Sequence, residues 1–312
     1  MQVIIRAMEP SDIPEVVRGW NLSLTHNQTD EARFERMILG DPNHEKGASL
    51  VAIHDGKIAG FISSIAREGV SGVDGRGRPY EKDNGYIKGM FVLEEFRRRG
   101  IGTKLLDGVK NYMRSKGKSV IRIVTYTGWY FFPGVDLRYE AALKFFDDEG
   151  FHQAHLINDV DLDLKNFQIS DYQKEARRRM AEFGVHVEEY DPSMLAKMRE
   201  FVHKVNMTAW FPEGWEKGFK KKGNKFAAFK DGEIVGWASY HPRTGTAGFG
   251  PIAVLEEMRG HGVGSCLMLE CVLRMKDAGA DSVIASWANT PFYLPNDWKI
   301  CRQYSVLEKR IN

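Results

Sequence analysis

The sequence predicts an α/β protein made of two consecutive copies of one domain, with strands and helices mixed in each copy. The chain has 312 residues, which is long for a single domain. The stretches EEFRRRGIG, from Glu94, and EEMRGHGVG, from Glu256, are nearly the same and lie 162 residues apart. A second pair, AIHDGKIAGFIS from Ala52 and AFKDGEIVGWAS from Ala228, precedes them in the same order. Matched blocks in a fixed order, separated by loops of different length, indicate a duplicated domain.

Each half is expected to begin with a strand, a helix and a hairpin. In the first half, residues 3–8 read VIIRAM and start a strand, and Pro10 with Ser11 and Asp12 marks the start of a helix. Asp-Gly pairs at 55–56 and 231–232 stand between apolar runs. Such pairs favour the tight turn of a β-hairpin.

A strand, the glycine-rich loop, a helix and another strand follow in each half. The strands before the loops end at Val92 and Val254, and the later strands read VIRIVTY, from Val120, and SVIASWA, from Ser282. The helices after the loops are predicted from apolar residues at helical spacing. These are Leu105, Leu106, Val109, Tyr112 and Met113 in the first half and Leu267, Met268, Cys271, Val272 and Met275 in the second.

We therefore expect an N-terminal domain at 1–165, a connecting helix within 166–184 and a C-terminal domain at 185–312. The connecting segment contains YQKEARRRMAEFG, which is charged and ends at Gly184, a plausible helix stop. The first half also carries a glycine-rich and charged insertion at 67–86, which we expect to form a long loop.

The composition restricts the class of protein. Lys and Arg total 44 and Asp and Glu total 42, so the net charge of +2 argues against a bulk nucleic-acid or membrane-surface binder. Cys266, Cys271 and Cys301 do not have zinc-ligand spacing, and we expect no metal. The sparse, odd cysteine count and the lack of a signal-peptide core at the N-terminus favour a cytoplasmic protein.

The glycine-rich loops are suited to holding a phosphate or diphosphate. Each follows a strand and begins a helix, and glycine allows a tight turn and close approach to a ligand. The first amides of the helix have no intrahelical acceptor, and with the helix dipole they attract an anion. The loops match neither the P-loop pattern nor the dinucleotide fingerprint.

The pattern Arg-x-x-Gly-x-Gly, between a strand and an amphipathic helix, resembles the pyrophosphate loop of the GNAT acyltransferase superfamily. The matching residues are Arg97, Gly100 and Gly102 in the first half and Arg259, Gly262 and Gly264 in the second. The resemblance covers most of both halves, so the chain looks like a tandem GNAT protein. It implies a mixed, mostly antiparallel sheet flanked by helices, with acyl-CoA bound at a V-shaped split between two central strands.

The resemblance also implies which residues contact CoA. In the first half these are Met90, Val92, Arg97, Arg98, Arg99, Gly100, Ile101 and Gly102, and in the second they are Ile252, Val254, Arg259, Gly260, His261, Gly262, Val263 and Gly264. Pro251 agrees with a split strand in the second half, because proline cannot donate to a sheet ladder. The position matching Pro251 in the first half is Gly89.

In many members of the family a tyrosine protonates the departing thiolate, within a pattern similar to A-x-x-F-Y-E-K-x-G-F. The first half has Phe146 at that position, and a phenyl ring has no proton to give. The second half keeps a Phe-Tyr pair, so Tyr293 is the candidate acid and the second half the expected catalytic domain. Glu213, among aromatic residues, is the candidate that binds a cationic amine or takes its proton, directly or through water, with a plain surface carboxylate as the alternative. The first half could bind CoA without turnover, serve as a scaffold, or catalyse without this tyrosine.

The leading hypothesis is an acyl-CoA-dependent N-acyltransferase that uses acetyl-CoA and an amine of a small molecule or peptide. We expect no nucleic-acid or membrane partner, and a homodimer is compatible with the sequence. Two alternatives stay open: a non-catalytic CoA-binding or sensing protein on the same fold, and a tandem acyltransferase of the kind that synthesises a thiol cofactor.

Overall fold

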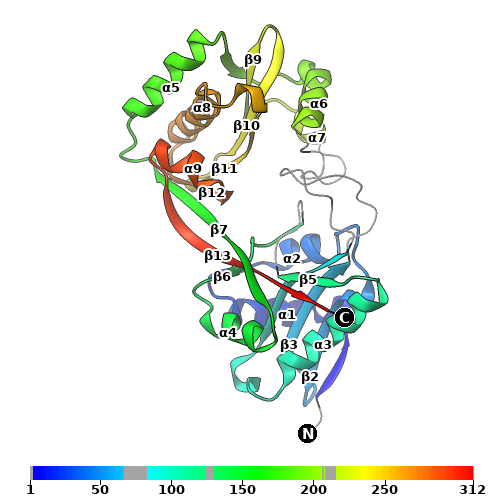
Figure 1. The fold of residues 1–312 in the computed structure, drawn as a ribbon. Coiled ribbons are helices and arrows are strands. Elements are labelled where there is room, and N and C mark those ends of the chain that lie inside the picture. The colour runs from blue at the N-terminus through cyan, green and yellow to red at the C-terminus, as the bar shows by residue number, and fades with distance from the viewer. Residues whose placement is uncertain (1–2, 67–82, 124–128, 206, 208–215, 312) are drawn as a thin grey trace. The chain divides into compact units, whose positions relative to one another are not determined.

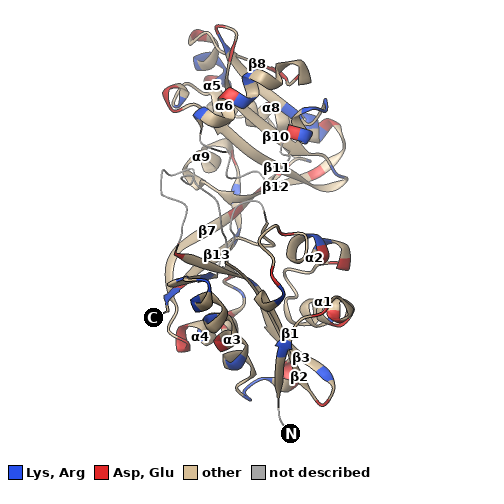
Figure 2. Cartoon of the chain, turned by 90° about the vertical axis from the view of Figure 1, so that its right-hand side faces the viewer, with Lys and Arg blue, Asp and Glu red and all other residues tan. Residues whose placement is uncertain are grey.

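The computed structural model describes residues 3–66, 83–123, 129–205, 207 and 216–311. Within these residues the chain forms two compact units, whose elements are labelled in Figure 1. The first unit contains the residues before Ile157 together with the end of the chain from Tyr304, and the second contains Ile157–Gln303. Basic and acidic residues are interspersed along both units (Figure 2), in keeping with the small net charge.

The first unit is a mixed sheet with helices on both faces. Its strands are β1 Ile4–Ala7, β2 Ser49–His54, β3 Lys57–Ala66, β4 Asn84–Val92, β5 Val120–Ile123, β6 Val135–Asp136, the start of β7 His152–Asp163 and the end of β13 Lys299–Arg310. Its helices are α1 Ile13–Ser23, α2 Glu31–Ile38, α3 Ile101–Ser115 and α4 Glu140–Asp148, with 3₁₀ turns η1 Pro10–Asp12, η2 Lys46–Ala48 and η3 Glu94–Phe96. The strand order is β1-β2-β3-β4-β5-β13-β7, and β6 pairs with β13.

The second unit repeats this plan. Its strands are the end of β7, β8 His186–Glu189, β9 Lys225–Lys230, β10 Glu233–His241, β11 Gly245–Val254, β12 Ala280–Ala288 and the start of β13. Its helices are α5 Asp171–Glu182, α6 Leu195–Lys204, α7 Glu216–Phe219, α8 Val263–Asp277 and α9 Thr290–Tyr293, with 3₁₀ turns η4 Pro192–Met194, η6 Glu256–Met258 and η7 Leu294–Asn296. The strand order is β8-β9-β10-β11-β12-β7-β13.

The sheets are mixed and mostly antiparallel, as predicted. The pairs β4–β5 and β11–β12 are parallel, whereas β1–β2, β2–β3, β3–β4, β8–β9, β9–β10 and β10–β11 are antiparallel. Both predicted hairpin turns form. Asp55 and Gly56 have φ of 52° and 77°, and Asp231 and Gly232 have φ of 51° and 78°. Two successive positive φ angles give the type I′ turn that matches the twist of a hairpin.

The last strand of the chain belongs to the first unit for part of its length. The end of β13 pairs antiparallel with β5, from Leu307 opposite Ile123 to Arg310 opposite Val120. In the second unit, the corresponding place beside β12 is taken by the end of β7, with Ser282 opposite Asp163. The sequence predicts the whole C-terminal segment, 185–312, to be one domain. A local residue pattern predicts that a strand forms but not which strand it pairs with, because strand pairing depends on residues far away in the chain.

Helices cover both faces of the first sheet over separate cores. One core joins α3 and α4 to the sheet and includes Leu105, Val109 and Phe146, and another joins α1 and α2 to the sheet and includes Trp20 and Phe34. The second unit has a large core around Trp237, Leu267 and Trp298. Burying these side chains removes apolar surface from water, which is the main stabilising contribution to a fold of this kind.

The expected connecting helix forms as α5, and it is part of the second unit. Its first turn carries a capping box, in which the Ser170 hydroxyl accepts from the Gln173 amide and the Gln173 side chain accepts from the Ser170 amide. Gly184, which follows the helix, has φ of 75° and ends it as predicted. The expected long loop at 67–86 lies outside the described residues up to 82, and β4 begins at Asn84.

Candidate functional site

The first glycine-rich loop is open. After β4 and η3, Arg97 is extended, Arg98 and Gly100 have φ of 61° and 72°, and α3 begins at Ile101. The Arg97 Nε–H donates to the carbonyl oxygen of Val92 at 3.0 Å, which fixes the entry to the loop. Arg97 to Gly100 are exposed, and a Cβ atom placed on Gly100 would meet nothing within 4 Å. The first amides of α3 therefore lie at an accessible, positively charged surface, as an anion-binding loop requires.

The second loop has the same backbone. Arg259 is extended with φ of −70° and ψ of 152°, close to the −67° and 162° of Arg97. Gly260 and Gly262 have φ of 83° and 84°, and α8 begins at Val263. The two copies of the sequence therefore produce two copies of one turn.

The surroundings of the second loop differ, because helix α5 lies against it. A Cβ atom on Gly262 would be 2.2 Å from the carbonyl oxygen of Ala176, which is part of α5. The His261 ring stacks on the Phe183 ring, with centroids 3.6 Å apart. Ser265 and Cys266 in the first turn of α8 are 6% and 2% exposed, whereas Thr103 and Lys104 at the matching positions of α3 are exposed.

The parallel central strands separate in the second unit. The pairing of β11 with β12 ends at Gly248 opposite Ile284, although β12 continues to Ala288 beside β7. Pro251, preceded by a cis peptide bond, lies beyond this last pair, and Ile252 and Val254 follow it. In the first unit, the pairing of β4 with β5 is described up to Ile87 opposite Ile123. Met90 and Val92 lie further along β4 and are partly buried.

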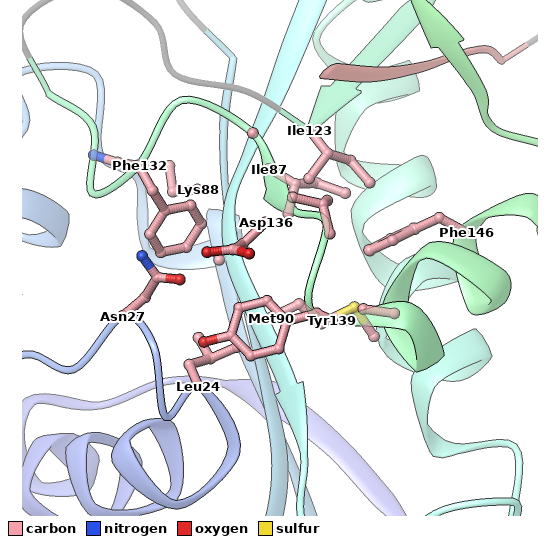
Figure 3. Close-up of a pocket in the computed structure, with 14 residues that line it drawn as sticks. Leu24, Asn27, Ile87, Lys88, Met90, Ile123, Phe132, Asp136, Tyr139 and Phe146 are labelled. Carbon is pink, nitrogen blue, oxygen red and sulfur yellow. The ribbon is translucent and has the colours of Figure 1, made fainter. Parts of the chain in front are cut away.

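A pocket opens beside β4 in the first unit (Figure 3). Its apolar wall comes from β4, β5, the β6 segment and α4. This wall includes Ile87, Met90, Ile123, Val135, Ala142 and Phe146. Its polar lining is Asn27, Lys88, Asp136 and Tyr139. A largely apolar cavity with a few converging polar groups is the usual form of a small-molecule site.

Both charged residues of the pocket have a partner of opposite charge. Lys88 Nζ donates to the Asp41 carboxylate at 2.7 Å and to the Met37 carbonyl oxygen, and the Lys88 and Asp41 side chains are almost fully buried. Burial lowers the pKa of Lys88, and Asp41 opposes this change. Asp136 is also buried, and it accepts from Arg138 Nε at 2.8 Å. The pKa of Arg138 is raised because its guanidinium donates to Asp136.

Tyr139 is a polar pocket residue that the sequence analysis missed. It precedes α4 and lies seven residues before Phe146, so the two lie near one face of the helix two turns apart. Both line the pocket. The Tyr139 hydroxyl oxygen accepts from the backbone amide of His26 at 2.9 Å. Its sequence signal is the spacing of seven residues from Phe146, which is two helical turns.

The two catalytic candidates of the second half are placed differently. Tyr293 ends α9 and is 6% exposed, with its ring centroid 5.2 Å from that of Trp298. Burial raises the pKa of Tyr293. Glu213 lies outside the described residues. Asp297 follows η7 with φ of 67°, at the position where the family pattern has glycine.

The described residues contain no cluster of three or more His, Cys, Asp or Glu side chains that could hold a metal ion. They also contain no helix that is long and apolar enough to span a bilayer.

Comparison with known proteins gives matches for both halves. The acetyltransferase (GNAT) family matches residues 14–128 and 188–293. N-alpha-acetyltransferase 60 of Xenopus tropicalis is 25% identical over 128 residues, which are 37% of this chain and 47% of that relative. The match thus spans about half the length of the relative.

Solved structures resemble the whole chain in fold. A GCN5-related glucosamine N-acetyltransferase region of a fungal multi-domain GH3 beta-N-acetylglucosaminidase has a TM-score of 0.79 at 18% identity, covering 99% of this chain and 38% of that one. A GCN5-related N-acetyltransferase from Sphaerobacter thermophilus has a TM-score of 0.70 at 16% identity, covering 99% and 96%. A tandem GNAT protein from the clavulanic acid biosynthesis pathway has a TM-score of 0.63 at 16% identity, covering 100% and 99%. With a family match in each half and this shared fold, the chain belongs to the acetyltransferase (GNAT) family and carries two GNAT domains in tandem.

Proposed function

We propose that the protein is an acyl-CoA-dependent N-acyltransferase whose reaction takes place in the first unit. The observation that carries the proposal is the open loop at Arg97–Gly102, on the same strand-loop-helix segment whose strand lines the pocket. The family generally uses acetyl-CoA, and we propose acetyl-CoA as the acyl donor.

The residues of the first unit fit the parts of CoA. The first amides of α3 and the side chains of Arg97, Arg98 and Arg99 would hold the diphosphate. Met90 and Val92 would lie along the pantetheine arm, with Met90 already in the pocket wall. The thioester would then supply an activated acyl group next to the polar lining of the pocket.

This proposal moves catalysis from the second half to the first. The sequence favoured the second half because Tyr293 survives there. Two observations support the first half instead: α5 covers the second loop at Gly262, and Tyr293 is enclosed by Phe249, Phe292 and Trp298.

We assign Tyr139 as the proton donor in place of Phe146. The amine nitrogen attacks the thioester carbon, the C–S bond breaks, and the sulfur receives the Tyr139 hydroxyl proton. The proton lost by the amine leaves to water and is returned to the phenolate. The backbone amide of His26 already donates to the Tyr139 oxygen at 2.9 Å, and this hydrogen bond holds the hydroxyl in position at the pocket.

The acceptor is proposed to be an amine of a peptide or small molecule. The similarity to N-alpha-acetyltransferase 60 favours a peptide amine, and the fungal protein of similar fold is a glucosamine N-acetyltransferase region. Asn27, on the segment between α1 and α2, and the aromatic ring of Phe132 lie at the pocket and could contact the acceptor.

The test is thiol release from acetyl-CoA with panels of N-terminal peptides and amino sugars. Tyr139→Phe is expected to lower kcat at least about 100-fold, the usual lower range for a lost general acid, with CoA affinity unchanged. Tyr293→Phe is the matched comparison in the second half. A large loss of kcat in Tyr293→Phe, with an unchanged kcat in Tyr139→Phe, would instead assign catalysis to the second half.

A non-catalytic CoA-binding protein is the second candidate, because Phe146 stands where the family tyrosine is expected. It predicts tight CoA binding at the first loop with no turnover for any amine in the panel. That result would refute the transferase proposal while leaving the binding site in place.

A further inference from the structure

We infer that helix α5 occupies the space in front of the second glycine-rich loop, where a ligand would otherwise bind. Each chain consequently binds CoA at one loop only. The CoA part of this inference rests on the proposed function. The structural part, that α5 occupies the space in front of the second loop, stands on contacts within the second unit.

The central contact is between two backbones. The Ala176 carbonyl oxygen lies 2.2 Å from the place where a Cβ on Gly262 would be, so only glycine leaves room for α5 at this point. Ala176 and Gln173, both on α5, are 0% and 1% exposed. A ligand held by the first amides of α8 must lie in front of that helix end, and α5 is packed there.

Side chains fasten α5 on both sides of this contact. The His261 ring of the loop stacks on Phe183, just after α5. Lys230 Nζ, at the end of β9, lies 3.4 Å from the centroid of the same Phe183 ring. Arg177 Nη2 donates to Glu270 Oε1 of α8 at 2.8 Å. Helix α5 also contacts η7, which follows Tyr293. His261 and Arg177, two of the basic groups near the loop, are therefore engaged with protein.

The sequence of α8 fits a covered helix. Its first turns carry Ser265, Cys266 and Leu269, all buried, where α3 carries Thr103, Lys104 and Asp107, all exposed. The helix face that is polar and charged in α3 is thus largely uncharged and apolar in α8. Such a change is explained when another element packs against that face, as α5 does here. Burial raises the pKa of the Cys266 thiol to about 11, in keeping with that covered position.

Calorimetric titration with CoA tests the inference. We expect one site per chain in the wild type. Arg98→Asp and Gly260→Asp form a matched pair, because the two residues are equivalent in the repeat, are exposed and have positive φ. Asp at either position would repel a diphosphate, and it tolerates this backbone region. Arg98→Asp should weaken binding more than tenfold, and Gly260→Asp should leave the affinity and the site number unchanged.

Two sites in the wild type, or loss of binding in Gly260→Asp, would overturn the inference. No binding in the wild type would refute the proposed function instead, so a measurement without ligand is needed as well. Hydrogen–deuterium exchange of the free protein provides it. Amides in the first turn of a helix lack intrahelical acceptors, so they exchange quickly unless other structure covers them.

We expect slow exchange in a peptide covering His261–Cys266 and fast exchange in the equivalent peptide Arg99–Lys104. This outcome supports α5 as the partner of the second loop whatever CoA does. Equally fast exchange at both loops would overturn the inference even if a single CoA site were found.

Discussion

The substitution Gly262→Ala, compared with Gly100→Ala, separates the packing of α5 from the geometry of the loop. Both glycines precede a helix with left-handed φ, 84° and 72°, so an added methyl group produces the same backbone strain in each. We estimate that strain at about 1–2 kcal/mol. The methyl group would be in open space at Gly100 but 2.2 Å from the Ala176 oxygen at Gly262, far inside van der Waals contact.

The additional cost at Gly262 is that of overpacking, about 1–3 kcal/mol. We therefore expect the free energy of unfolding to fall by about 1–2 kcal/mol in Gly100→Ala and by about 2–5 kcal/mol in Gly262→Ala. The sign of the difference matters more than its size, because displacement of α5 would relieve part of the clash while exposing its apolar face.

Urea titration read out by hydrogen–deuterium exchange measures each unit separately. Protection of α8 reports on the second unit and protection of α3 on the first, so that the analysis does not assume one transition for the whole chain. Gly262→Ala should also speed exchange in α5, and Gly100→Ala should not. Equal destabilisation by the two substitutions, with α5 unaffected in both, would refute the assignment of α5 to the second loop.

Three further predictions concern the first unit. Lys88→Met should lower its stability by about 3–5 kcal/mol, because the substitution leaves the buried Asp41 carboxylate without its cation; urea titration measures the loss, and an unchanged midpoint would contradict a buried ion pair. A chain that ends after Gln303 should lose protection from hydrogen exchange in β5, because the end of β13 is the antiparallel neighbour of β5. Retained protection of β5 would contradict this pairing. The hydrogen bond from Arg6 lowers the pKa of Asp12 in the folded state. Its stabilising effect is therefore present above the unfolded pKa of ~4 and is lost as the pH falls through the folded pKa. Asp12→Asn should show a shallower loss of stability in acid than the wild type, and identical acid titrations of the two would contradict the prediction.

Several features of the fold could be read directly from residues. Asp-Gly at 55–56 and 231–232 predicted two hairpin turns, and both have the positive φ pair. Gly184 predicted the end of the helix that became α5. The duplication followed from motif order, and the resemblance of both loops to the GNAT pyrophosphate loop implied the family and a mixed, mostly antiparallel sheet. The family match in both halves and the strand pairings confirm them.

The candidate site was less predictable. The two loops have almost the same backbone, yet a Cβ on Gly100 would be in open space and one on Gly262 would meet α5, and no local feature of EEMRGHGVG distinguishes them. The sequence signal for the covered second loop is the contrast between Lys104 and Cys266. A charged residue on the exposed face of the first helix is replaced by an apolar one at the equivalent position of the second. Tyr139 could not be predicted from the family pattern, because that pattern marks only the position of Phe146, and Tyr139 lies seven residues earlier, before α4 begins.

The sequence alone determined the elements: two copies of a strand-loop-helix unit, their turns and their glycine conformations. These depend on neighbouring residues, since backbone angles and helix periodicity are local properties. Tertiary structure decided which loop is accessible, which strand β13 accompanies and which tyrosine reaches the pocket. Each of these is a contact between segments distant in the chain, such as Ala176 with Gly262 or Leu307 with Ile123, and packing in three dimensions fixes it.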